Sequence, residues 1–198
     1  MAFDPRMSDE TDAALLARSA DGDAAAATEL YRRHATAVYR FVWASSGSES
    51  EAADVLQETF MTILERRSGY DPDRGSCTAY LCGVARHLLY RRFDHRTEPH
   101  AEMDDLAEQA AVIPALLAPH EQMERAQALQ RLHIAIRALP PHYRDVLILI
   151  ELQEMSYSDT AAITGIELGT VRSRLARARA RLTELLGASI ANTDGQAR

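Results

Sequence analysis

The sequence predicts an all-α protein of two small helical domains joined by an acidic linker. Apolar residues recur at helical spacing through most of the 198 residues, and no segment has the alternation typical of a strand or hairpin. Residues 97–124 differ, because they carry seven acids and three prolines but no arginine or lysine. We therefore expect a first domain over 11–95, the linker over 96–122, a second domain over 123–187 and a flexible tail over 188–198.

The composition limits the class of protein. The chain is 46% hydrophobic and 26% charged, which is ordinary for a globular protein. No apolar run is long enough to span a membrane, and the N-terminal residues lack the basic and apolar parts of a signal peptide. We therefore expect a cytoplasmic protein without membrane insertion.

The helical patterns of the first domain cover residues 11–20, 24–45, 49–67 and 76–93. Cys77 and Cys82 lie on the last of these, five residues apart, and so point in different directions. A disulfide between them is disfavoured, and we expect both thiols to be buried. The same spacing argues against a metal site made of these cysteines and His87. We therefore predict no metal and no cofactor.

The third helical segment of this domain has an acidic face. Asp54, Gln57 and Glu58 lie on one side of it, opposite an apolar stripe that includes Val55 and Phe60. Most such faces are simply solvated. If this face does bind a partner, its negative charge would suit a basic protein surface.

The fourth helical segment carries aromatic and basic side chains on its outward side. These are Tyr80, His87, Tyr90 and Arg91. Aromatic rings offer stacking surfaces to unpaired bases while arginine follows the phosphate backbone, so this pattern is typical of single-stranded nucleic-acid binding. The alternative is that the two tyrosines cover a neighbouring helix with their hydroxyls in water.

The second domain ends in a predicted helix-turn-helix. Helical patterns at 125–139 and 143–152 flank Pro140 and Pro141, and a further pair of helices follows Ser156. Ser156 can cap the first helix of this pair, with Asp159 in the reciprocal capping position. Gly165 can adopt the positive φ of the turn between the two helices.

The last helix of this motif has a face of one charge sign. Five arginines and no acid lie between Leu168 and Thr183. A merely solvated helix usually mixes both signs, whereas the arginine fork suits phosphate and guanine edges. The segment therefore predicts DNA binding, although the whole chain has a formal net charge of −7, since the local distribution matters more than the sum. The candidate residues are Thr170, Arg172, Ser173, Arg174 and Arg177.

Three blocks of sequence agree with one known family. They are DVLQETF at 54–60 with YDPDRGSCTAYLCGVARH at 70–87, the block from ALPPHYRD to ARARARL at 138–182, and the opening LLARSADGDAAAATELYRRH. The first two carry the resemblance and, with the opening, extend it over roughly residues 12–186; the chain resembles the extracytoplasmic-function (ECF) group of the bacterial RNA polymerase sigma factor family. The chain departs from the family in its turn, GIELGTV, which lacks a common proline, and in Tyr80, where tryptophan is common.

The resemblance implies a role in promoter recognition. The face with Asp54, Gln57 and Glu58 would bind core RNA polymerase, and the second domain would bind the −35 element through the five candidates above. The partners implied are core polymerase, promoter DNA and an anti-sigma factor, with no small-molecule substrate and no catalytic residue. The residues that would bind the −10 element as a single strand are Tyr70, Arg74, Tyr80, Arg86, His87, Tyr90 and Arg91.

Two other functions remain open at this stage. A free-standing helix-turn-helix regulator would bind DNA without polymerase, but it would leave the first domain without a role. A sigma mimic that titrates an anti-sigma factor would not need the basic face formed by Arg172, Arg174 and Arg177.

Overall fold

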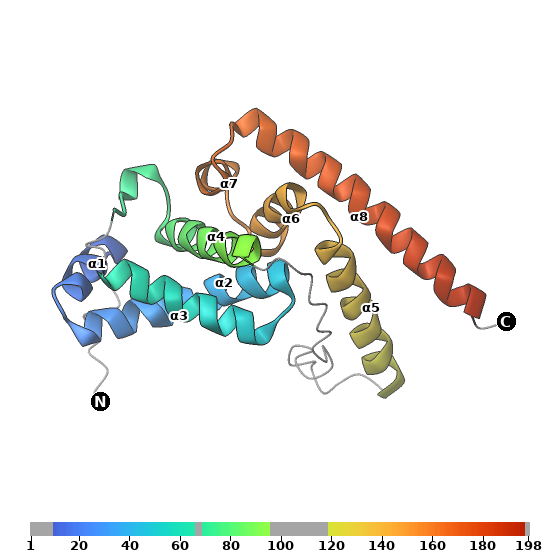
Figure 1. Ribbon diagram of the computed structural model, residues 1–198, viewed down its shortest axis with the longest axis horizontal. Coiled ribbons are helices and arrows are strands. Elements are labelled where there is room, and N and C mark those ends of the chain that lie inside the picture. Colours follow the sequence, from blue (N-terminus) through green and yellow to red (C-terminus); the bar gives the residue numbers. More distant parts are fainter. Residues whose placement is uncertain (1–9, 66–68, 96–118, 197–198) are drawn as a thin grey trace.

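The computed structural model describes residues 10–65, 69–95 and 119–196 (Figure 1). Every regular element within these ranges is a helix, which confirms the all-α prediction. The chain forms two groups of helices, one on each side of the segment 96–118, which lies outside the described residues.

The first group contains four α-helices. They are α1 (Asp12–Ala20), α2 (Ala24–Ser46), α3 (Glu49–Glu65) and α4 (Cys77–His95), with the short 3-10 helix η2 (Pro72–Arg74) before α4. Thr11 and Asp23 cap the first two through their side chains. Gly47, at φ 74°, makes the left-handed turn that brings α3 back along α2. Phe41, Val55 and Leu81 are fully buried between these helices.

The second group contains the predicted helix-turn-helix. Its elements are α5 (Pro119–Arg137), α6 (Pro141–Leu147), the π-helical turn η3 (Ile148–Leu152), α7 (Tyr157–Thr164) and α8 (Leu168–Gln196). Pro141 is the first residue of α6, where a proline costs no hydrogen bond, so this helix begins two residues earlier than the pattern predicted.

Two expected boundaries differ from the helix bounds of the structure. The segment 188–198 was expected to be a flexible tail, and α8 continues through it to Gln196, since no proline interrupts the helical pattern there. The predicted linker extended to residue 122, but α5 already begins at Pro119. A proline at the first helical position followed by Glu121 favours a helix start at this point.

The two groups pack directly against each other, which the sequence did not predict. Helix α4 lies against α7, and α2 lies against α5 and η3 (Figure 1). Buried residues from both groups, such as Phe41 and Leu149, belong to one contiguous apolar cluster. The helices of the first group are therefore partly covered by those of the second.

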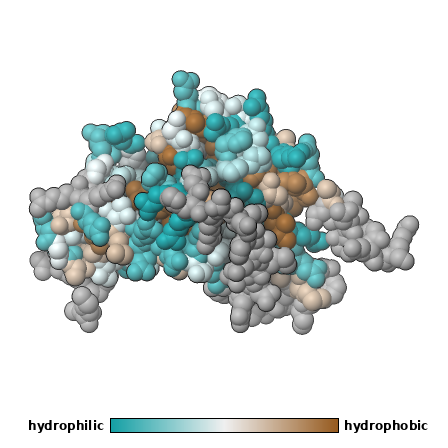
Figure 2. Space-filling model, viewed as in Figure 1, coloured by the Kyte–Doolittle hydropathy of each residue, from teal (hydrophilic) through white to brown (hydrophobic). Residues whose placement is uncertain are grey.

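The outer surface is mixed. Hydrophilic residues dominate the face shown in Figure 2, with smaller apolar areas between them. None of the described helices is both long enough and apolar enough to cross a membrane.

Candidate functional site

The helix-turn-helix has the local geometry that the sequence predicted. The Ser156 hydroxyl accepts a hydrogen bond from the Asp159 amide at 2.9 Å, and Gly165 takes the left-handed conformation at φ 68°. In a complete capping box the Asp159 carboxylate would accept a hydrogen bond from the Ser156 backbone amide. Here it accepts instead from the Ser156 hydroxyl and from the amide of Ser76 at the start of α4. Val171 and Leu175 of α8 are buried, so the opposite side of α8 faces outward.

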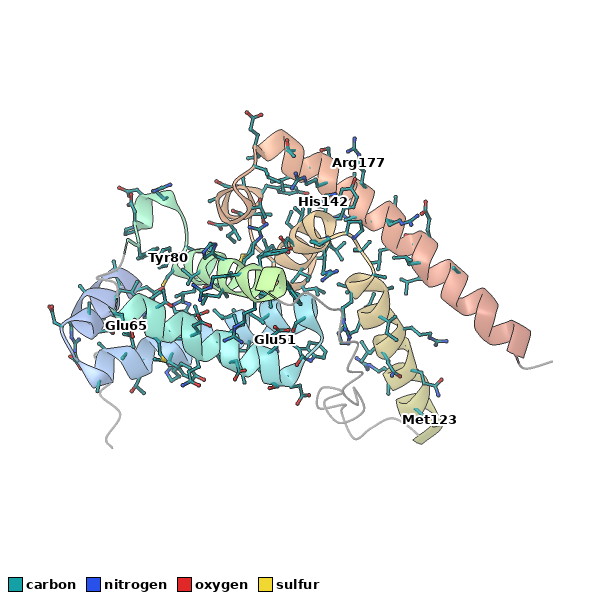
Figure 3. The ribbon with its side chains drawn as sticks, in the orientation of Figure 1. Glu51, Glu65, Tyr80, Met123, His142 and Arg177 are labelled. Carbon is teal, nitrogen blue, oxygen red and sulfur yellow. The ribbon has the colours of Figure 1, made fainter. Side chains whose placement is uncertain are left out.

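The arginines of α8 differ in their partners. Arg179 pairs with Glu151, Arg181 pairs with Glu184 at 2.9 Å, and Arg172 lies over the Tyr157 ring at 5.9 Å. By contrast, Arg174 and Arg177 form no ion pair or hydrogen bond through their side chains to any residue in the described ranges. Figure 3 shows Arg177 on the outer side of α8.

The other two candidates on α8 lie beside these arginines. The Ser173 hydroxyl donates to the Thr170 carbonyl at 3.0 Å and is exposed, while Thr170 is half-buried. The outward surface of α8 therefore presents two unpaired guanidinium groups next to short hydroxyl side chains. This combination can bind phosphates and base edges in a groove of duplex DNA.

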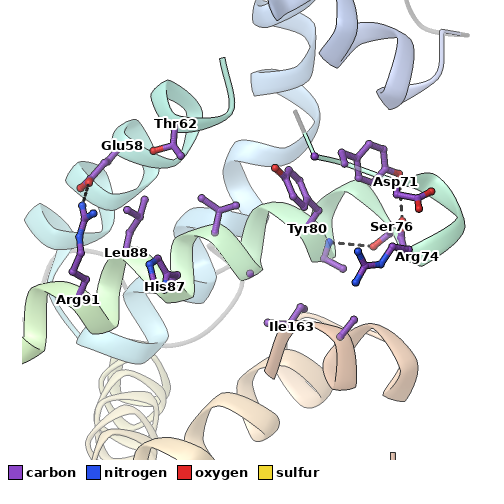
Figure 4. Close-up of a pocket in the computed structure, with 17 residues that line it drawn as sticks. Glu58, Thr62, Asp71, Arg74, Ser76, Tyr80, His87, Leu88, Arg91 and Ile163 are labelled. Atoms are coloured by element: carbon purple, nitrogen blue, oxygen red, sulfur yellow. Dashed lines mark hydrogen bonds and ion pairs between the residues drawn. The ribbon is translucent and has the colours of Figure 1, made fainter. Parts of the chain in front are cut away.

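A pocket of about 530 Å³ lies between α3, the η2 turn, α4 and α7 (Figure 4). The rings of Tyr70 and Tyr80 lie next to each other there, tilted by 44°, with their centroids 5.6 Å apart. The Tyr70 hydroxyl donates to the Gly75 carbonyl at 3.3 Å, which holds the turn against α4. Five of the predicted single-strand contacts line this pocket: Tyr70, Arg74, Tyr80, His87 and Arg91.

Arg86 and Tyr90 do not line this pocket. Arg86 Nε donates to the Asp145 carboxylate at 2.6 Å, and the Tyr90 hydroxyl donates to the same carboxylate at 3.0 and 3.1 Å. Burial, followed by the charge of Asp145, raises the pKa of Tyr90. Tyr90 is half-buried, and its hydroxyl is bonded to Asp145 of α6, so the prediction that it faces solvent holds only in part. For this residue the alternative of a tyrosine against a neighbouring helix is the better description, with its hydroxyl bonded to the Asp145 carboxylate.

The acidic face of α3 is partly neutralised within the chain. Asp54 and Gln57 are exposed, as predicted, but Glu58 pairs with Arg91 and Arg92 of α4, each at 2.7 Å. Arg92 also lies 3.7 Å from the Asp54 carboxylate. Sequence reasoning missed Arg92, although a basic residue next to Arg91 was a visible signal.

Both cysteines are buried and free, as predicted. Burial raises the pKa of Cys77 and of Cys82 to about 12, so both are neutral thiols near pH 7. Cys77 lies near Asp12 and His34, within a group of three possible metal ligands. Asp12 is already paired with Arg33 at 2.9 Å. The positive charge of the Arg33 guanidinium opposes the binding of a metal cation at this group.

The geometry thus defines a helical protein with two separate nucleic-acid-binding candidates, one on α4 and one on α8. Two family models match the chain at these places: Sigma-70 region 2 over residues 30–99 and Sigma-70, region 4 over residues 129–182. The first match contains α4, and the second contains α7 and most of the arginine face of α8.

Individual relatives show which group within this family the chain resembles. The ECF RNA polymerase sigma factor SigM of Mycobacterium tuberculosis is 32% identical over 183 residues, which are 90% of this chain and 86% of that protein. The ECF RNA polymerase sigma factor SigE of Mycolicibacterium smegmatis is 33% identical over 171 residues, 84% of this chain but only 65% of SigE. This chain belongs to the ECF group of RNA polymerase sigma factors.

Solved structures agree on the fold. The sigma factor RpoE of Bartonella quintana, in complex with the anti-sigma factor NepR, matches with a TM-score of 0.62 and 26% identity over 81% of this chain and 96% of that one. CnrH in complex with the cytosolic domain of CnrY matches with a TM-score of 0.65 and 24% identity over 90% and 99% of the two chains.

Proposed function

We propose that this protein directs core RNA polymerase to a specific set of promoters and helps to open the −10 element. Its second domain places α8 in the major groove of the −35 element, and α4 with the Tyr70–Tyr80 pocket receives unpaired bases of the −10 element. The polymerase performs the chemistry, and this chain supplies the sequence specificity. The protein works in the cytoplasm.

The observation that carries this proposal is the pair of arginines on α8. Arg174 and Arg177 project from a correctly capped helix-turn-helix without an acidic partner among the described residues. Two like charges held close together without compensation destabilise an isolated helix, and a DNA groove provides the missing anions. The guanidinium fork can contact a guanine at O6 and N7, so these positions are suited to reading sequence.

The pocket beside α4 supports the second contact. It holds two tyrosine rings that provide a stacking surface, with Arg74 and Arg91 at its edge. A flipped or unstacked base loses its neighbours in the duplex, and an aromatic ring replaces part of that stacking energy, about 1–3 kcal/mol per base. The pocket therefore favours open DNA over closed duplex.

The exposed carboxylate of Asp54 and the amide of Gln57 give α3 a polar face that suits a basic surface of core polymerase. Glu58 belongs to the same face, although its carboxylate also holds Arg91 and Arg92. An anti-sigma factor is a further proposed partner, because the RpoE structure that this fold matches was solved with one.

The test is run-off transcription by core polymerase on a library of promoter fragments, with and without this protein. We expect initiation only in its presence and only on a subset of sequences. Footprints on duplex DNA in the absence of polymerase would instead identify a free-standing regulator. Binding to core polymerase without initiation on any template would favour a mimic that titrates an anti-sigma factor.

A further inference from the structure

Asp12, His34 and Cys77 come from three helices of the first group and meet at one place. One donor atom from each, a carboxylate oxygen, a ring nitrogen and the thiol sulfur, lies within 4.8 Å of the other two. Asp12 is the first residue of α1 and Cys77 the first residue of α4, while His34 lies within α2, which packs against both of these helices. The group therefore shares only Cys77 with the combination of Cys77, Cys82 and His87 that the sequence argued against.

His34 has a buried ring nitrogen that its surroundings leave unsatisfied. The residue is 7% exposed, and its Nδ1 lies 3.0 Å from the Thr78 hydroxyl. Its Nε2 lies 3.1 Å from Asp12 Oδ2, but it makes no hydrogen bond of acceptable geometry to any residue in the described ranges. When Nδ1–H donates to Thr78, the lone pair of Nε2 faces a carboxylate oxygen, and a cation between these two atoms would satisfy both. Because buried polar atoms in folded proteins nearly always have a partner, this nitrogen points to a ligand.

Arg33 restricts this group but does not block it. Its Nη1 donates to Asp12 Oδ1 at 2.9 Å, and this is the carboxylate oxygen that does not face His34. The same side chain donates to the Glu29 carboxylate and to the Glu10 carbonyl, each at 2.8 Å. Glu29 therefore offsets part of the positive charge, and Arg33 orients Asp12 as the hydrogen-bonded partner of a ligating carboxylate does. The rest of the charge lowers the affinity for a metal, while Oδ2 still points toward His34.

We propose that Asp12, His34 and Cys77 bind a divalent transition-metal ion of the zinc type, with water as the fourth ligand. Imidazole nitrogen and thiolate sulfur favour zinc over magnesium or calcium, which prefer oxygen ligands. Tetrahedral zinc holds its ligand atoms about 3.5 Å apart, so the donor atoms have to approach one another by roughly 1 Å. The Asp12 side chain is 26% exposed, and this opening gives the ion its path and the water its place. Cys77 binds as the thiolate, and its proton passes to the solvent as the metal–sulfur bond forms.

The ion joins α1 and α2 to the start of α4. Cys77 follows the turn that the Tyr70 hydroxyl holds through the Gly75 carbonyl, so the metal anchors the end of α4 from which this turn leaves. Only the folded chain brings ligands from three helices together, so the metal stabilises the folded state by mass action. At a free metal concentration about 100 times the dissociation constant, we expect Tm to rise by about 5–10 °C. This role is independent of the proposed role in transcription.

The experiment uses the untagged full-length protein, kept reduced and freed of metal with a chelator. Co²⁺ is the spectroscopic probe, because a cobalt–thiolate bond adds a charge-transfer band to the absorption spectrum, and Zn²⁺ is the probe for Tm. The variant is Cys77→Ala, and the control is Cys82→Ala, which removes a second buried thiol from the same helix but outside the group. Asp12→Asn is the second variant, because it removes the carboxylate charge and keeps an oxygen for Arg33.

The proposal predicts one Co²⁺ per chain, with a thiolate band in the wild type and in Cys82→Ala but not in Cys77→Ala. Asp12→Asn should bind Co²⁺ at least about tenfold more weakly, and Zn²⁺ should raise Tm most in the wild type and in Cys82→Ala. A wild-type chain with neither band nor Tm shift would overturn the proposal, and so would a band that persists in Cys77→Ala or is lost from a folded Cys82→Ala. If circular dichroism shows that Cys77→Ala loses helix, Asp12→Asn decides, because unchanged Co²⁺ affinity in that variant also overturns the site.

Discussion

Arg177→Ala tests whether α8 reads DNA sequence. The Arg177 side chain is exposed and has no partner among the described residues, so its removal should change the free energy of unfolding by less than about 0.5 kcal/mol. If its guanidinium contacts a guanine in two places, the loss of binding should be about 1–3 kcal/mol, or about 5- to 150-fold.

The matched control is Arg181→Ala. Arg181 lies one helical turn further along α8, and its side chain and that of its partner Glu184 are 60% and 65% exposed. An ion pair this exposed contributes about 0–1 kcal/mol to the stability of the fold. The substitution Arg181→Ala removes one positive charge, as Arg177→Ala does. We therefore expect Arg181→Ala to stay close to the wild type in both stability and promoter binding.

The assay is equilibrium binding of the holoenzyme to labelled duplex promoters at fixed salt. One set of promoters carries the −35 motif recovered from run-off transcription, and the other carries a scrambled −35 element. Arg177→Ala should lose affinity for the first set and little for the second. An equal loss on both sets, with a salt slope reduced by about one, would show that Arg177 contacts phosphate and does not read sequence.

Three further predictions concern the first domain. Replacing Asp54 and Glu58 with arginine should weaken association with core polymerase in a pull-down or titration, and unchanged affinity would mean that this face of α3 is merely solvated. Tyr80→Ala removes one of the two rings in the pocket and should reduce the permanganate reactivity of −10 thymines more than it reduces closed-complex formation; unaltered reactivity would refute the stacking role. Glu29 accepts hydrogen bonds from Arg32 and Arg33, which lower its pKa from 4.5 to about 2. A lowered pKa gives stability that is present above the unfolded value and is lost as the pH falls, so Glu29→Gln should lower Tm at pH 7 and flatten the dependence of Tm on pH between about 4.5 and about 2. An unchanged acid profile would show that these arginines do not stabilise the folded state through Glu29.

Short-range chemistry explains why most helices could be predicted. The Ser156 cap, the left-handed Gly165 and the buried Val171 depend on neighbours within a few residues, so the pattern of side chains determines them. The same holds for the buried cysteines on α4. For the nucleic-acid-binding candidates, periodicity correctly placed Arg177 on the outside of α8, and the Tyr80 ring lies in a pocket beside α4.

Long-range contacts explain what could not be predicted. Asp145 is separated by 59 residues from Arg86 and by 55 from Tyr90, and no local pattern indicates that a carboxylate so distant covers them. Glu58 and Arg91 are 33 residues apart and were assigned to two different surfaces, yet they form one ion pair. Charged residues that appear free on a helical wheel can therefore be partners in the folded chain.

These partners give the two proposed DNA surfaces different electrostatics. On α4, Arg91 and Arg92 are paired with Glu58 of the same domain, and in the free chain Arg86 is paired with Asp145 of the other domain. A phosphate that binds there must replace a carboxylate, so the net gain in Coulomb energy is small. On α8, Arg174 and Arg177 have no carboxylate to lose within the described chain, so each phosphate contact adds its full effect of counterion release. The salt dependence of promoter binding should therefore come mainly from α8. Contact with the −35 element should precede occupation of the α4 pocket, because only the second step requires bonds within the protein to break.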